Sequence, residues 1–140
     1  MASLRRMRAA WQQIVSCLLV TLISAPLFAA SPSLGIILPR GIQRGMETEV
    51  TFNGGRLDDA EEIFFYSPGF EVLSLEATAS QVKVMVKVGE NARLGEHVAQ
   101  VRTRSGISEY KTFFVSPYAN VDEVEPNSSF DEPQAIAMNV

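Results

Sequence analysis

Few side chains in this sequence could do chemistry. The only histidine, His97, follows Gly95 and Glu96, and the only cysteine, Cys17, lies in an apolar stretch near the N-terminus. Nucleophilic catalysis with a histidine base would therefore have to centre on His97. A zinc site needs several histidine or cysteine ligands, which the sequence does not supply. A lone histidine at the start of a predicted strand is better explained as a surface or packing residue, so we expect no enzyme activity from these 140 residues.

Two pairs of neighbouring carboxylates, Asp58-Asp59 and Glu61-Glu62, are the next candidates. Glycoside hydrolysis needs two carboxylates held across a cleft, about 5–10 Å apart. Neighbours in one polar loop point outward instead, so we interpret both pairs as solvated loop charge. Gly54-Gly55 follows a predicted strand, but no helical pattern comes after it, so it indicates a turn and not a phosphate-binding loop.

The elements that must position these side chains are all predicted to be strands. Apolar residues alternate with polar ones between glycine-rich turns, and no stretch after Ser31 keeps helical spacing for three turns. The clearest alternation is that of Val82, Val84, Val86 and Val88, which we expect to face a core. Seven short strands at this spacing predict an all-β, immunoglobulin-like sandwich. The predicted strands are 35–38, 48–52, 63–66, 70–75, 81–88, 97–103 and 110–115.

The N-terminal segment has the layout of a secretory signal peptide. Arg5, Arg6 and Arg8 precede an uncharged run from Ile14 to Phe28, which ends in small residues. We therefore expect residues 1–30 to form a signal peptide helix that is removed on export to the periplasm, the cell surface or the medium. An uncleaved membrane anchor is the alternative, but the run is shorter than the roughly 20 residues that span a bilayer.

Cleavage near Ala30 would leave nine basic residues against sixteen acidic ones, so the net charge of the remaining chain would be −7. Nucleic acids and anionic membranes are bound by clustered lysine and arginine, so neither is an expected partner. Contact with a membrane is expected only through the uncleaved signal peptide. The remaining chain also has no cysteine, so its core must hold the fold without a disulfide.

Residues 117–140 differ in composition from the predicted sandwich at 33–116. Five acids and no basic residue lie between Asn120 and Val140, as in an acidic linker, yet the chain ends on the apolar run 135–140. We therefore expect the sequence to stop inside a further domain. Asn127-Ser128-Ser129 matches an N-glycosylation acceptor, a match that would have no consequence if the source were bacterial.

Two segments of the predicted sandwich resemble IPT/TIG domains, the immunoglobulin-fold modules of large secreted bacterial proteins. Residues 38–45 lead through a proline and glycine turn into 49–54 and Leu57, as at the start of that family. Residues 92–97, 101–103, 106–108 and 113–115 are similar to the strand–turn–strand closure of such domains. The resemblance implies a spacer, adhesion or dimerisation module.

Residues 123–129, with 133–135 after them, resemble the start of the bacterial pre-peptidase C-terminal domain, a β-sandwich appended to secreted proteases and surface proteins. In collagenase-type relatives the equivalent segment supplies oxygen ligands to calcium. By position, Glu123, Glu125 and Asn127 would be those ligands. Calcium takes six to eight oxygens, so these three would need ligands from a complete following domain. No other cofactor is expected.

The expected function is a non-catalytic interaction or spacer module of an exported bacterial protein. Its partners would be other extracellular domains, surface proteins or polysaccharides. Two alternatives remain open. The chain could be the N-terminal piece of a secreted peptidase whose catalytic domain lies elsewhere, or a carbohydrate-binding module that uses aromatic side chains such as Tyr66 and Tyr118.

Overall fold

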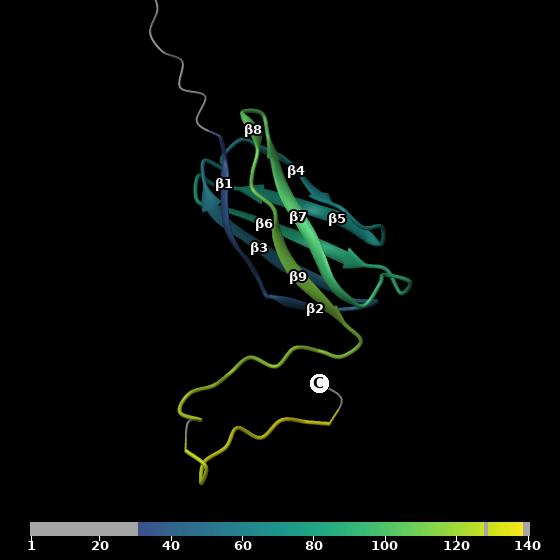
Figure 1. Cartoon of the computed structure of the whole chain (residues 1–140), viewed down its shortest axis with the longest axis vertical. Coiled ribbons are helices and arrows are strands. Elements are labelled where there is room, and N and C mark those ends of the chain that lie inside the picture. The colour runs from purple at the N-terminus through teal and green to yellow at the C-terminus, as the bar shows by residue number, and fades with distance from the viewer. Residues whose placement is uncertain (1–30, 128, 139–140) are drawn as a thin grey trace, which may run out of the picture.

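The computed structural model describes residues 31–127 and 129–138, all of which lie in strands or in irregular segments (Figure 1). The expected signal peptide helix lies outside these residues, as does Ser128. Nine strands occur in the described part of the chain. They are β1 (Ser33–Leu38), β2 (Gly41–Gln43), β3 (Glu47–Gly55), β4 (Ala60–Phe65), β5 (Phe70–Ala77), β6 (Gln81–Val88), β7 (Gly95–Thr103), β8 (Gly106–Ile107) and β9 (Lys111–Ser116).

The strands form two sheets, seen as two layers in Figure 1. The first, called the β3 sheet, has the order β1-β3-β6-β5, and all its neighbouring strands are antiparallel. The second, called the β7 sheet, has the order β2-β9-β7-β4, and β8 also pairs with β7. Only β2 and β9 run parallel. Because β1 and β2 are separated by two residues, the chain crosses from one sheet to the other within that short connection.

The two sheets enclose one apolar core. Val82, Val84, Val86 and Val88 are each at most 1% exposed, which confirms the predicted inward face of that strand. Side chains from both sheets share this core; the largest are Phe52, Phe113, Ile37, Ile42 and Leu57. Valine and phenylalanine thus supply the burial that a small domain without a disulfide requires.

Two strands were not predicted, so the expected count of seven is wrong. β2 has three residues and β8 has two, and both fall where the sequence indicates turns. Strands this short carry too little alternation to be recognised from sequence. They form here because neighbouring strands already offer hydrogen-bonding groups: Arg44 N–H donates to Ser116 O over 2.9 Å, and Phe114 N–H donates to Arg40 O over 2.8 Å.

The turn predicted at Gly54-Gly55 is also wrong, because these residues extend β3. Gly54 is needed for a close approach between strands: a Cβ built on it would lie 1.9 Å from Ser33 O of β1. A positive φ is found at Arg56, directly after the strand, with φ of 57°. Gly54 therefore allows the close pairing of β3 with β1, and the chain turns at Arg56, the first residue after β3.

Residues 117–127 and 129–138 contain no strand, but they are tied to the sandwich at their start. Gln43 Nε2 donates to Pro117 O over 3.2 Å, and Asn120 Nδ2 donates to Gly41 O. Further on, Gln134 Nε2 donates to Asp122 O over 2.8 Å, which closes this segment into a loop (Figure 1).

Candidate functional site

His97 lies in the core and not at a reactive surface. It is 1% exposed on β7. Its ring stacks on that of Phe113, with centroids 5.7 Å apart, and meets that of Phe70 edge to face, with centroids 4.9 Å apart. Its Nε2 lies 2.6 Å from Arg93 O. Since a carbonyl only accepts, Nε2 carries the proton, and the buried Nδ1 has no partner among the described residues. His97 is a packing residue that also holds the loop before β7.

The guanidinium of Arg102 forms ion pairs with the carboxylates of both Glu61 and Glu62. Arg102 donates to both over 2.8 Å, and Arg104 lies 3.8 Å from Glu61. The hydrogen bond to Glu62, with smaller contributions from the charges of both carboxylates, raises the pKa of Arg102. Both residues belong to β4, so the predicted loop position is wrong. The bulge between Ala60 and Glu62 in the pairing of β4 with β7 accompanies this cluster.

The three predicted calcium ligands lie next to one another. Asn127 Nδ2 donates to Glu123 Oε1 over 3.0 Å, and Asn127 N–H donates to Glu125 Oε2 over 2.8 Å. The backbone and side-chain N–H groups of Asn127 thus point toward the two carboxylates. A calcium ion would instead be bound by the side-chain amide oxygen of Asn127. In residues 31–127 and 129–138 no group of three His, Cys, Asp or Glu side chains could hold a metal. As arranged, these residues do not form a coordination shell, and calcium binding stays a prediction that requires a further domain.

Exposed aromatic side chains gather on the outer face of the β7 sheet. Phe64, Tyr66 and Phe114 are 46–59% exposed, and they alternate with the inward-facing Ile63, Phe65, Phe113 and Val115. We call these three side chains the aromatic face. Phe64 and Tyr66 meet edge to face with ring centroids 5.0 Å apart. Ile107 of β8, 55% exposed, lies opposite Arg102 at the end of this sheet.

The middle of this face is uncharged and partly ordered by hydrogen bonds. The Tyr66 hydroxyl donates to Gln100 Oε1, and Gln100 Nε2 donates to Ser108 O over 2.6 Å. Val98 and Thr112 pair across β7 and β9 between the aromatic side chains. Charged residues lie at its two ends: Glu96 is directly opposite Phe114, and the Arg102 cluster lies at the other end. The face is therefore apolar and aromatic at its centre and charged only at its ends.

Sequence reasoning singled out Tyr66 but missed Phe64 and Phe114. The signal was present, because each lies next to an inward-facing apolar residue in a predicted strand and must face the other way. Tyr118, the other aromatic residue named for sugar binding, lies beyond β9 in the irregular segment and is exposed there.

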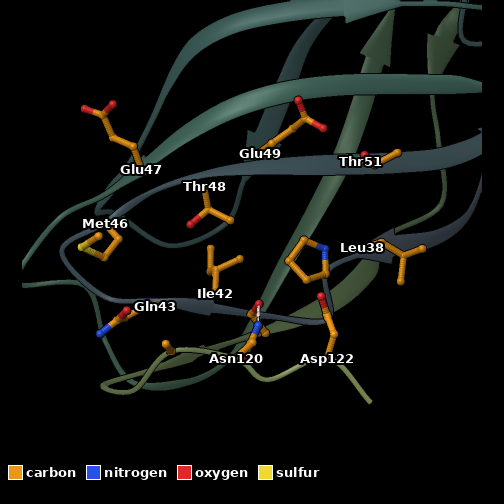
Figure 2. Close-up of a pocket in the computed structure, with 13 residues that line it drawn as sticks. Leu38, Ile42, Gln43, Met46, Glu47, Thr48, Glu49, Thr51, Asn120 and Asp122 are labelled. Carbon is orange, nitrogen blue, oxygen red and sulfur yellow. Dashed lines mark hydrogen bonds between the residues drawn. The ribbon is translucent and has the colours of Figure 1, made fainter. Parts of the chain in front are cut away.

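A groove lies between the two sheets at the end where the chain crosses from β1 to β2 (Figure 2). Its volume is about 610 Å³. In Figure 2, residues of β3 form one wall, and β2 together with Asn120 and Asp122 forms the other. The largest apolar residues of the lining are Leu38, Pro39, Ile42 and Met46, and the charged side chains of the lining are all acidic: Glu47, Glu49 and Asp122.

No protein-family model matches the chain, and a search of curated proteins found no significant match. Within the described residues there is no helix with the length and apolar character needed to cross a bilayer. The case for a function therefore depends on the chemistry of the two surfaces described above.

Proposed function

We propose that this chain is a non-catalytic interaction module of an exported protein, built on an immunoglobulin-like sandwich of the IPT/TIG type. The aromatic face is the surface that binds, and its partner is another protein domain. The observation that carries this proposal is the concentration of Phe64, Tyr66 and Phe114 on one sheet face whose centre has no charge.

The composition of this face supports a protein partner. Centres of protein–protein interfaces are enriched in aromatic residues and depleted of charge, and polar residues surround them. Tyrosine in particular often contributes most of the binding free energy. Tyr66 is already held by Gln100, so less side-chain freedom would be lost on binding. A partner that covers Phe64 and Phe114 would remove apolar area from water.

Export is proposed from the N-terminal sequence. A polysaccharide could also stack on aromatic rings and bond to Gln100, and it is the alternative that the experiment must separate. Reading the coding sequence beyond Val140 would show whether a peptidase domain follows.

Site-specific photo-crosslinking tests the binding face. A benzophenone side chain is placed at Thr112, between the aromatic residues, or at Lys83, on the outer face of the β3 sheet. In the source cells we expect one crosslinked protein species from position 112 and none from position 83, with the product lost in Phe64→Ser/Phe114→Ser. Equal crosslinking at both positions would contradict the proposal. Specific signals on a glycan array that require the same two phenylalanines would assign the face to polysaccharide instead.

A further inference from the structure

β3 is longer than the edge strand beside it. The pairing of β1 with β3 runs from Ser33 opposite Gly55 to Leu38 opposite Thr51, where β1 ends. The chain then crosses to the other sheet and forms β2. On its other side β3 stays paired with β6 as far as Glu47 opposite Lys87. Residues 47–50 therefore have a strand on one side only, within the part of the chain that the structure describes.

The free side of β3 presents backbone hydrogen-bonding groups. Val88 N–H donates to Met46 O, and Gly54 N–H donates to Ser80 O, each over 2.9 Å. The peptide groups of these even-numbered residues thus face β6. In an antiparallel strand the direction alternates along the chain, so the N–H and C=O groups of Glu47 and Glu49 face the open side. Two residues of sheet edge are left without a neighbouring strand.

The groove lies along this open edge, since Glu47, Thr48, Glu49 and Thr51 all line it (Figure 2). Four residues of strand span about 13 Å, so the edge suits a short extended segment. The apolar lining lies between β3 and β2, where Ile42 is 2% exposed. This is the arrangement that strand addition needs: a row of free backbone groups beside pockets for alternate side chains.

The charge of the groove selects the occupant. The carboxylates of Glu47, Glu49 and Asp122 belong to its lining, and no lysine or arginine does. Lys83 of β6 lies 3.9 Å from Glu49, and Lys87 is opposite Glu47, but neither lysine lines the groove. An acidic segment, such as residues 120–140 of another copy, would be repelled. We propose that the groove binds an extended peptide with alternating basic and apolar residues, which adds to the edge of β3 in the place that β1 vacates. This site is separate from the aromatic face and does not rest on it.

The test uses the full chain and three synthetic hexapeptides, read out by fluorescence anisotropy and by amide hydrogen exchange. The first peptide alternates lysine and valine, the second alternates glutamate and valine, and the third is the lysine peptide with alternate backbone nitrogens methylated. We expect only the first to bind, and we expect it to slow exchange at the amides of Glu47 and Glu49 by roughly tenfold or more. Binding of the methylated peptide with equal affinity, or binding without protection of these two amides, would overturn the proposal.

The charge requirement is tested with Glu47→Gln/Glu49→Gln/Asp122→Asn. We expect about fivefold weaker binding of the lysine peptide and a weaker dependence of affinity on salt. Glu71→Gln/Glu76→Gln removes two carboxylates from β5, at the opposite edge of the same sheet, and should bind like the wild type. Equal losses in both variants, or concentration-dependent dimerisation of the chain that the peptide does not displace, would contradict a basic peptide as the occupant.

Discussion

The two outer faces of this molecule have opposite chemistry although they cover one core. The outer face of the β3 sheet alternates acidic and basic side chains across its strands: Glu47 pairs with Lys87, Glu71 also pairs with Lys87, and Glu76 pairs with Lys83. Lys83 also lies 3.9 Å from Glu49. The outer face of the β7 sheet carries Phe64, Tyr66 and Phe114 around an uncharged centre.

This difference shows which face is adapted to water. Exposed cross-strand ion pairs contribute little to stability, but they keep a sheet face hydrated and unattractive to other proteins. Exposed aromatic side chains gathered on one face have no such use in an isolated domain, and such surfaces often bind other proteins, which supports the proposed function. We therefore propose that water covers the outer face of the β3 sheet, away from its open edge at residues 47–50, and that a partner covers the β7 sheet. The predictions below test how far the two faces are independent.

The largest expected effect comes from breaking the core that both faces share. Val84→Asp places an unpaired charge at a position that is 1% exposed, and it should destabilise the fold by several kcal/mol and unfold the domain. Lys83→Ala, at the next position of β6 but on the outer face, should change the free energy of unfolding by no more than about 0.5 kcal/mol. Circular dichroism melts of both variants provide the measurement. Wild-type melting of Val84→Asp would mean that the faces of β6 are reversed.

A smaller loss of folding stability is expected from Gly54→Ala, which disturbs only the edge of the β3 sheet. The new Cβ would lie 1.9 Å from Ser33 O, so β1 would have to move away from β3. We expect a loss of about 3 kcal/mol in urea unfolding. Gly45→Ala is the matched control: its φ of 79° strains a side chain, but the nearest atom is 3.5 Å away, so a loss near 1 kcal/mol is expected. Equal losses in the two variants would remove the case for a close approach of β1 to Gly54.

Removing the aromatic face should cost little stability. Phe64 and Phe114 are 46% and 50% exposed, so each change to Ser should cost about 1 kcal/mol or less in urea unfolding. Phe113→Ala, at the neighbouring but buried position of β9, should cost about 3–5 kcal/mol. If Phe114→Ser were as destabilising as Phe113→Ala, the aromatic face would be part of the core and not a surface for binding.

The smallest effect concerns a link between the two sheets. Leu34 N–H of β1 donates to Glu109 Oε2 over 2.9 Å, and this hydrogen bond, before all other causes, lowers the pKa of Glu109. A lowered pKa in the folded state gives stabilisation that is complete above the ordinary pKa of glutamate and is lost as the pH falls through the lowered value. Glu109→Gln does not titrate, so its free energy of unfolding should fall less steeply with acidification below roughly pH 5. A slope equal to that of the wild type would contradict this role of Glu109.

The sequence predicted the all-β class and the inward face of β6, because strict alternation and burial are local properties. It failed where tertiary pairing decided the structure. Glycine is common in turns, but Gly54 instead allows β1 to approach β3 closely. β2 is a strand only because β9 lies beside it. The predicted loop acids Glu61 and Glu62 are gathered by Arg102, about 40 residues away in the sequence. Alternation already indicated that Phe64 and Phe114 face outward, but only the pairing of β4 and β9 with β7 shows that they share one sheet face.

The central claim is that the aromatic face binds and the charged face does not. The most direct test is a titration of the crosslinked partner, once identified, against two double variants. For Phe64→Ser/Phe114→Ser we predict at least a tenfold loss of affinity, which corresponds to about 1.4 kcal/mol. For Lys83→Ser/Glu76→Ser we predict a change of no more than about twofold. Equal weakening by the two variants, or a loss confined to Lys83→Ser/Glu76→Ser, would contradict the assignment of the β7 sheet as the binding face.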